Sequence, residues 1–299
     1  MTTSLTERPQ AQQRVRRLPV TVVLPVLNEE QNLPAALESV AWADEVLVVD
    51  SGSTDDTVEV ATAAGASVIP FAYDPSGPRK KAWALANLEP RNPWTLLLDA
   101  DERVPDELAD EIAAAIAADD HDGWYVDRQF VFMGRQIRCF SPNWNLRLFR
   151  SGRARMEDLG LADLPGTGDN EIHEHVEVEG RLGFLQRQLL HDDDRGLTAW
   201  LDRHNRYATW EAHLYRRFRQ EPIGVGLLGF LRLDPFKRKR VLRRVWVRLP
   251  CRPLLRFFVW YVVRQGFRDG RAGFIFCTLM AYYEFIIGAK LRELQGRTT

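Results

Sequence analysis

An α/β fold organised on a doubly wound parallel sheet is predicted by two features of the first third of the chain. Short β-branched or apolar runs at residues 20–24, 45–49, 66–69 and 94–98 alternate with helical segments. This order is typical of a parallel sheet with helices on its faces. The second and fourth runs are each followed by an aspartate, and open parallel sheets bind ligands at the carboxyl ends of their strands. The sequence therefore predicts the fold class and the edge of the sheet that carries a site.

The elements of this half follow one another at short intervals. Pro25 closes the first strand, and the apolar residues Leu33, Leu37 and Val40 then recur at helical spacing. A second helix is predicted over 57–64, after a small polar loop. A third helix has a basic start and leads to the fourth strand. The chain thus reads as strand and helix in strict alternation.

The second half continues with further strands and one long helix. Residues 122–132 and 145–150 alternate in polarity, so we expect antiparallel strands that extend the sheet. A helix over 197–219 carries large side chains at spacings of three and four, which indicates core packing, with stacking on a sugar as the alternative. These side chains are Trp200, His204, Tyr207, Trp210 and Leu214.

The composition is that of a folded protein. Of 299 residues, 45% are hydrophobic and 27% are charged, which excludes disorder of the whole chain. Cys139, Cys251 and Cys277 are far apart and form no Cys-x-x-Cys pair, which argues against a disulfide framework or structural zinc and favours a reducing cytoplasm. Residues 1–17 are polar and lack the apolar core of a signal peptide, so we expect a mobile tail.

Two acids, Asp99 and Asp101, follow the fourth strand. Side chains two residues apart lie on one face of a strand, so both are expected to point into one crevice and to share a divalent cation. Mg²⁺ or Mn²⁺ in that position would clamp a diphosphate. The alternative is that these acids cap a helix that begins near Pro105.

Glycine-rich phosphate loops are missing from the predicted sheet. The first strand is not followed by Gly-x-Gly-x-x-Gly, and no Gly-x-x-x-x-Gly-Lys-Ser/Thr segment occurs, which disfavours a dinucleotide-binding domain and a P-loop NTPase. Phosphates would then be held by a metal ion and basic side chains. Lys80 and Lys81 are the candidates, with a solvated helix face as the alternative.

Three motifs in order resemble the nucleotide-sugar-binding half of glycosyltransferase family 2. They are Val-Val-Leu-Pro-Val-Leu-Asn-Glu-Glu at 22–30, Val-Val-Asp-Ser-Gly-Ser-Thr-Asp at 48–55 and Leu-Asp-Ala-Asp-Glu at 98–102. The resemblance covers roughly residues 19–105. It implies the GT-A fold, a Rossmann-like mixed sheet flanked by helices, with a donor site that depends on Mg²⁺ or Mn²⁺.

The resemblance also implies roles for individual residues at the donor. Pro25 and Glu29 would line the nucleotide, Asp50 would contact the uracil or ribose, and 51–53 would shape the turn beneath it. The full set of implied donor-binding residues is Pro25, Asn28, Glu29, Asp50, Ser51, Gly52, Ser53, Lys80, Lys81, Asp99, Ala100 and Asp101.

The segment 171–176 resembles the His-Glu motif of the branch that includes lipopolysaccharide-core β-glucosyltransferases. There the glutamate is the expected catalytic base, a role that the resemblance carries to Glu174. His191 is either a third ligand to the donor metal or a loop residue. A zinc site is disfavoured because the helical His-Glu-x-x-His arrangement is absent. The ligands of such a zinc site would be His173, His175 and His191. The candidates for binding the acceptor are His173, Trp144 and Arg147.

The last part of the chain is basic and apolar at once. The segment from Arg232 to Arg271 contains thirteen Arg or Lys residues but only two aspartates. The apolar runs at 254–263 and 274–283 are shorter than the ~20 residues that a spanning helix needs. We therefore expect amphipathic helices that lie in the headgroup layer of an anionic membrane, and not a nucleic-acid partner. The alternatives are a soluble core and a dimer interface. The segment 253–270 also resembles the C-terminal region of the same branch.

These observations predict an inverting, metal-dependent hexosyltransferase on the cytoplasmic side of the cell membrane, held peripherally. The donor would be a nucleotide-sugar, with UDP-glucose as the example, and the acceptor a hydroxyl of a membrane glycolipid or lipid-linked saccharide in cell-envelope polysaccharide biosynthesis. Transfer to polyprenyl phosphate and a non-catalytic membrane adaptor are the alternatives. The expected domains are a tail (1–17), a GT-A domain (18–221, donor half 18–105 and acceptor half 106–221) and a membrane-associating region (222–299).

Overall fold

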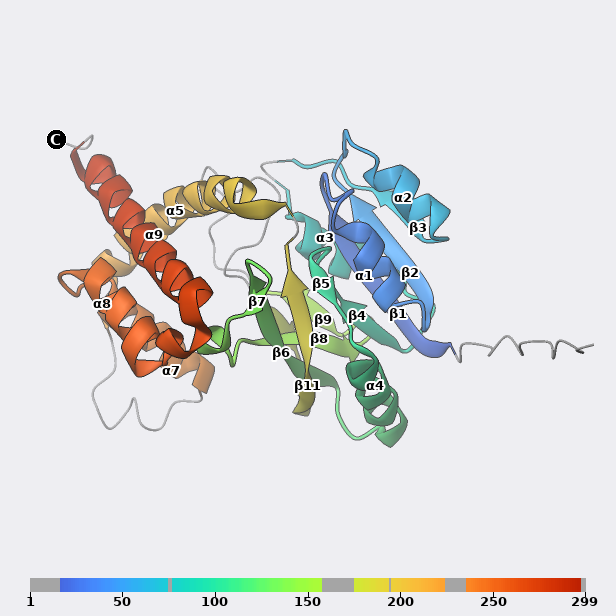
Figure 1. Ribbon diagram of the computed structural model, residues 1–299. Coiled ribbons are helices and arrows are strands. Elements are labelled where there is room, and N and C mark those ends of the chain that lie inside the picture. The colour runs from blue at the N-terminus through green and yellow to red at the C-terminus, as the bar shows by residue number, and fades with distance from the viewer. Residues whose placement is uncertain (1–16, 75–76, 158–174, 194, 224–234, 297–299) are drawn as a thin grey trace, which may run out of the picture.

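A mixed β-sheet forms the centre of the molecule, with helices on its faces and a helical bundle at one side (Figure 1). The computed structural model describes residues 17–74, 77–157, 175–193, 195–223 and 235–296. The strands are β1 (Leu18–Val26), β2 (Ala43–Asp50), β3 (Ser67–Pro70), β4 (Trp94–Leu97), β5 (Glu102–Arg103), β6 (Gly123–Phe132), β7 (Arg135–Gln136), β8 (Trp144–Arg150), β9 (Ala154–Met156), β10 (Val176–Val178) and β11 (Leu182–Asp192).

The strand order β3-β2-β1-β4-β8-β6-β11-β5 combines two kinds of pairing. β3, β2, β1 and β4 are parallel, as the alternation of strand and helix predicts. β8 then pairs antiparallel with both β4 and β6, while β11 runs parallel to β6. The predicted mixed sheet flanked by helices is therefore confirmed. The antiparallel strand β8 joins the parallel donor half to the second half of the chain.

Alternation along the strands builds a core on each face of the sheet. Val22 and Leu24 of β1 are buried on the face covered by α1, α2 and α4, whereas Val23 points to the opposite core with α3. Full burial of such a side chain is worth about 2 kcal/mol. The helices are α1 (Leu33–Ser39), α2 (Thr57–Ala63), α3 (Lys80–Asn87), α4 (Asp106–Ala118), η1 (Arg138–Phe140), α5 (Gly196–Gln220), α7 (Pro235–Trp246), α8 (Arg252–Phe258), η2 (Val259–Val263), η3 (Gly266–Asp269) and α9 (Gly270–Gly296).

The C-terminal bundle packs on the sheet and does not stand apart from it. α9 lies along α5 and α8 (Figure 1). Ala208, Ala212 and Tyr215 of α5 share a buried cluster with Ile287 and Leu291 of α9. A second cluster joins β6 and η1 to the bundle, and it contains Phe130, Phe132, Ile137, Cys139, Trp260, Phe276 and Cys277. One face of α9 is therefore part of the protein core.

The expectation that no C-terminal run reaches the length of a membrane span is wrong. η3 and α9 together form a 31-residue helical segment, Gly266–Gly296, with a mean hydropathy of 1.5 in its most apolar part. By length and composition alone this segment could cross a bilayer. The apolar run seemed to end at Glu284, but Glu284 is fully buried and paired with Arg252 and Arg256, so the helix continues through it.

Candidate functional site

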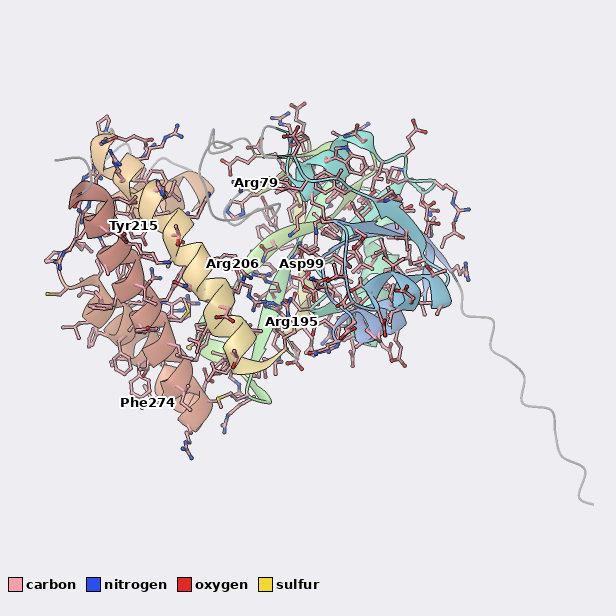
Figure 2. All side chains as sticks on the ribbon, turned by 90° about the horizontal axis from the view of Figure 1, so that it is seen from above. Arg79, Asp99, Arg195, Arg206, Tyr215 and Phe274 are labelled. Atoms are coloured by element: carbon pink, nitrogen blue, oxygen red, sulfur yellow. The ribbon has the colours of Figure 1, made fainter. Side chains whose placement is uncertain are left out.

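A pocket of about 450 Å³ opens where β1 and β4 end, between the sheet and α5. This volume is within the usual range for small-molecule sites. Asp99 lies on the sheet side, while Arg206 projects from α5 and Arg195 lies just before that helix (Figure 2). Phe276 and Met280 of α9 also line the pocket, so its wall combines the donor half of the chain with the C-terminal bundle.

The two aspartates lie in a turn and not in a strand, which corrects the expected strand-like alternation. β4 ends at Leu97, and the Glu102 amide donates to the Asp99 carbonyl at 2.9 Å. In return the Glu102 carboxylate accepts from the Asp99 amide at 3.0 Å. The helix-cap alternative is also wrong, because α4 begins after Pro105 with no side-chain cap. The turn still directs both Asp99 and Asp101 into the pocket.

Cationic side chains surround Asp99. Lys81 Nζ and Arg147 Nη2 each lie 2.6 Å from its carboxylate oxygens. Burial acts to raise the pKa of Asp99, but Arg147 and Lys81 outweigh it and hold the pKa well below its ordinary value. Lys80 is buried and donates to the Val26 carbonyl at 2.6 Å, so neither lysine is on a solvated helix face. Asp99 is therefore ionised and Lys81 is held in the pocket.

Asp101 has its own partner on β11. His191 Nε2 lies 3.1 Å from the Asp101 carboxylate, and the Asp192 amide donates to the Asp101 carbonyl at 2.9 Å. Burial alone would raise the pKa of Asp101, but His191 lowers it to about 2. The alternative that His191 is a loop residue is wrong, because it lies in strand β11. Its role as a third ligand to the donor metal stays a prediction, since an imidazole beside a carboxylate can also orient that carboxylate.

Behind the pocket, the acid Glu102, to which sequence reasoning gave no role, binds two arginines of the pocket wall. Glu102 is fully buried and accepts from Arg147 at 2.5 Å, while Arg128 of β6 lies 3.3 Å from the same oxygen. Arg147, an acceptor-side candidate, thus bridges Asp99 and Glu102. Glu102 follows the aspartate pair directly, and that adjacency was the signal that could have revealed it.

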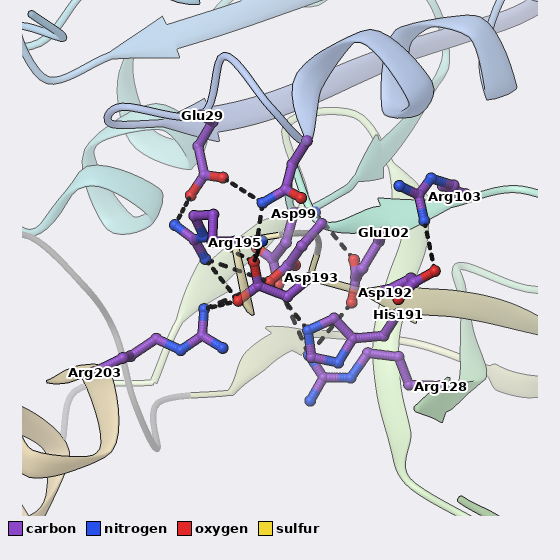
Figure 3. Close-up of polar contacts among 12 residues, drawn as sticks. Glu29, Asp99, Glu102, Arg103, Arg128, His191, Asp192, Asp193, Arg195 and Arg203 are labelled. Atoms are coloured by element: carbon purple, nitrogen blue, oxygen red, sulfur yellow. Dashed lines mark hydrogen bonds and ion pairs between the residues drawn. The ribbon is translucent and has the colours of Figure 1, made fainter. Parts of the chain in front are cut away.

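A second network crosses from the first loop to the start of α5 (Figure 3). Glu29 accepts from Arg195 at 2.7 Å and from Asn32 at 2.9 Å. Asp193 binds Arg195 at 2.8 Å and Arg203 at 2.6 Å. Burial raises the pKa of Glu29 to about 7 although Arg195 opposes the shift. Arginines at and just before the start of α5 therefore tie the second half of the chain to the donor half.

Arg128, Arg195, Arg203 and Arg206 line the pocket, and sequence reasoning did not single out any of them as binding residues. Tyr207 also lines it, and the sequence named Tyr207 as a candidate for stacking on a sugar. On α5, Arg203 and Tyr207 share the helical spacing of Trp200 and His204, so the aromatic periodicity contained a signal for them. Arg128 of β6 and Arg195, which precedes α5, had no such signal. Trp210 and Leu214 are buried as expected for core packing, whereas Trp200, His204 and Tyr207 line the pocket.

Other predicted donor residues lie outside this lining. The Asp50 carboxylate accepts from the Gly52 amide and the Ser53 amide and hydroxyl, and so shapes its own turn. The Asn28 side chain accepts from the Thr54 amide at 2.8 Å. In the part of the chain that the structure describes, these residues and Ser51 fix two neighbouring loops at the strand ends and do not line the pocket. Their contact with a nucleotide stays a prediction.

The acceptor-side candidates are separated. Trp144 packs edge-on against Phe184 and is not among the described lining residues. His173 and the candidate base Glu174 lie outside the described residues, but His175, next in the chain, lines the pocket. The base assignment therefore stays a prediction.

The acidic turn has the oxygen chemistry that Mg²⁺ and Mn²⁺ prefer. Among the described residues, no group of three or more His, Cys, Asp or Glu side chains is placed to hold an ion. Mg²⁺ is commonly bound by one or two carboxylates together with substrate phosphates. Asp99 and Asp101 thus fit an ion that arrives with a diphosphate better than one held by protein alone.

The chain is similar to known glycosyltransferases. Residues 21–168 match the model of the family described as Glycosyl transferase family 2. A lipopolysaccharide core biosynthesis glycosyltransferase, LpsC of Rhizobium meliloti (strain 1021), is 28% identical over 93% of this chain and 94% of its own length. An uncharacterized glycosyltransferase of Rickettsia typhi is 27% identical over 89% of this chain and 84% of its own.

Among solved structures, the crystal structure of S. aureus TarS 1-349 in complex with UDP-GlcNAc is similar to this chain. It is 17% identical, covers 90% of this chain and 92% of that chain, and gives a TM-score of 0.43. This TM-score is too low to support an argument, so the fold assignment rests on the strand order and the family match.

Proposed function

We propose that this chain, which belongs to glycosyl transferase family 2 by the match of residues 21–168, transfers a sugar with inversion from a UDP-hexose. The acceptor would be a hydroxyl of a membrane glycolipid or lipid-linked saccharide. The relative named for lipopolysaccharide core biosynthesis, which matches nearly the whole chain, supports an acceptor in the cell envelope. The expectation of UDP rests on the sequence motifs of the donor half.

The observation that carries the proposal is the charge of the pocket wall. Among the lining residues that the structure describes, cationic side chains outnumber the acids Glu29, Asp99 and Asp101. A surplus of positive charge in a partly buried pocket favours a polyanion such as a nucleoside diphosphate. The cations are Lys80, Lys81, Arg128, Arg147, Arg195, Arg203 and Arg206.

The reaction forms a bond from the acceptor oxygen to the anomeric carbon as the bond to the diphosphate breaks. Asp99 and Asp101 would hold the divalent ion, which when bound supplies Lewis-acid neutralisation of the leaving group. Lys81 and the pocket arginines stabilise the same negative charge as it develops. Glu174 is the predicted base that takes the hydroxyl proton, with attack from the face opposite the diphosphate.

A donor screen tests the proposal. The full chain is incubated with Mn²⁺, glycolipid extract and UDP-glucose, UDP-galactose, UDP-N-acetylglucosamine or GDP-mannose, and nucleotide release is measured. We expect release with one UDP-sugar that depends on the extract. Release only with GDP-mannose would overturn the donor assignment, and no release with any donor would overturn the proposed function.

The base is tested with Glu174→Gln, with Glu177→Gln as the matched control, since Glu177 is a half-exposed residue of strand β10 outside the pocket lining. We expect Glu174→Gln to lower kcat by at least about 100-fold, while the affinity for UDP is unchanged. An unchanged kcat would contradict the base and would favour polyprenyl phosphate, whose nucleophile is already ionised.

The C-terminal bundle would hold the enzyme on an anionic bilayer. The outward stripe of α9 contains Phe274, Tyr282 and Phe285, with Arg271 and Arg292 toward its two ends. Leu254 and Phe258 of α8 and Val263 of η2 are further exposed apolar side chains of the bundle, at 72%, 54% and 62%. Apolar side chains flanked by arginines suit a helix lying in the headgroup layer.

The opposite face of α9 argues against a membrane span. Glu284 is buried and lies 2.9 Å from Arg252 and 2.7 Å from Arg256. Placing α9 across a bilayer would either separate this ion cluster or carry it into hydrocarbon, and both are costly. The helix therefore satisfies the length of a span but has the packing of an interfacial element.

Vesicle flotation tests this membrane contact. We expect binding to phosphatidylglycerol vesicles that weakens in high salt and is lost in the Phe258→Ser, Phe285→Ser double variant. Phe184→Ser, which changes a phenylalanine of similar exposure on β11, is the matched control and should bind normally. Equal binding of all three proteins would contradict the proposed surface.

A further inference from the structure

His204 of α5 lines the pocket, and the proposed reaction assigns it no role. The preceding residue, Arg203, binds Asp193 at 2.6 Å and lies 3.9 Å from Asp101. His204 is therefore placed where the acidic turn meets the aromatic wall formed by α5 and α9. This wall includes Trp200, Tyr207, Phe276 and Met280.

The imidazole ring is fixed in one orientation. Its Nδ1 lies 2.8 Å from the Trp200 carbonyl oxygen, one helical turn earlier. A carbonyl can only accept a hydrogen bond, so Nδ1 carries the proton and Nε2 carries the lone pair. The ring also stacks on Trp200 with centroids 3.5 Å apart and meets the edge of Tyr283 at 5.2 Å. These contacts hold the ring plane before any substrate binds.

The same surroundings keep the ring neutral. Burial lowers the pKa of His204 to about 4, and Arg203 acts in the same direction, while the Trp200 carbonyl opposes the shift. At neutral pH the ring is therefore uncharged. Within the part of the chain that the structure describes, Nε2 has no hydrogen-bond partner. A fixed acceptor atom is thus available beside a wall whose other polar groups are mainly cationic donors.

We propose that His204 binds the saccharide acceptor by accepting a hydrogen bond, through Nε2, from one of its hydroxyls. The inference rests on the proposed function and specifies the acceptor class: a sugar whose apolar ring face packs on the aromatic wall. A neutral acceptor atom suits a hydroxyl, which can donate, and disfavours a phosphate anion, which cannot. His204 orients this hydroxyl and is not the base.

Kinetics of two His204 variants test the inference, with the glycolipid extract of the donor screen as the acceptor probe. His204→Phe keeps a flat ring on Trp200 but removes the lone pair. We expect it to raise the apparent acceptor KM about tenfold, as for one lost hydrogen bond, with the UDP-sugar KM unchanged. His204→Gln places a carboxamide oxygen near the position of Nε2, and it should recover part of the acceptor KM.

His213→Phe on the same helix, outside the pocket lining, is the matched control and should have the wild-type acceptor KM. A wild-type acceptor KM in His204→Phe, or an equal increase in the UDP-sugar KM, would overturn the inference alone. Transfer by the wild type to polyprenyl phosphate but not to the extract would overturn both the acceptor class of the proposed function and the inference.

Discussion

The donor end of the pocket is made by loops at the ends of strands, whereas the aromatic end is made by α5 and α9 from the second half of the chain. At the donor end, each acid lies among several cations, as Asp99 does with Lys81 and Arg147. At the aromatic end, rings pack on rings, and His204 stays neutral because it is buried. The donor end of the pocket is therefore suited to a charged ligand, and the aromatic end to an uncharged one.

This difference separates the two substrates by chemistry. A nucleoside diphosphate is attracted by the cationic wall, and a neutral saccharide is not. Packing on rings selects shape, and a directed lone pair selects a hydroxyl. Changes at one end should therefore alter the kinetic constants of one substrate more than those of the other.

The largest effect is expected from Asp101→Asn, which removes a proposed metal ligand. We expect kcat/KM for the UDP-sugar to fall by at least about 100-fold, since metal coordination supplies several kcal/mol of charge stabilisation. Nucleotide release at several Mn²⁺ concentrations measures it. Asp110→Asn on the exposed side of α4 is the control. A variant with wild-type activity at every Mn²⁺ concentration would refute the role of this turn.

The second-largest effect is expected in the pH dependence of stability, which should involve Glu29 at the donor end but not His204 at the aromatic end. The pKa of Glu29 is raised to about 7 in the fold, so its contribution to stability is present below pH 4.5 and is lost as the pH rises through 7. We expect this contribution to decrease by up to about 3 kcal/mol. Urea unfolding at pH 5, 6, 7 and 8 should show a flatter profile for Glu29→Gln than for wild type. Parallel profiles would contradict the shift. The acceptor KM should not follow this titration, because His204 is already neutral.

The smallest effect is expected from Arg203→Met, which removes a contact between the two ends. Arg195 still pairs with Asp193, so we expect only about a tenfold increase in the UDP-sugar KM and a nearly unchanged acceptor KM. Arg217→Met, on the same helix and paired with Glu221, is the control. An acceptor KM that rises as much as the donor KM would show that Arg203 serves both ends.

The donor end could be predicted because its signals are local. Asp99 and Asp101 directly follow a buried strand, so the sequence predicts their position at the mouth of the sheet, although it gives the wrong backbone for them. The position of Glu102 directly after the aspartate pair marks it as part of the site, but its pairing with Arg147, 45 residues later, could not be assigned from the sequence. The length of the last helix was predicted wrongly for the same reason, since the arginines that neutralise Glu284 are on α8, far from it in the sequence. Long-range pairing has no periodicity along the chain.

The joint between β11 and α5 has a consequence for protein engineering. β11 ends beside the acidic turn and α5 begins within a few residues, so the chain passes from one end of the pocket to the other through a short connection. A chimaera that exchanges the helices after this joint could acquire a different acceptor preference and keep its donor site. The chimaera would have to retain Asp193, Arg195 and Arg203, because the ion pairs among these residues connect the donor end of the pocket to α5.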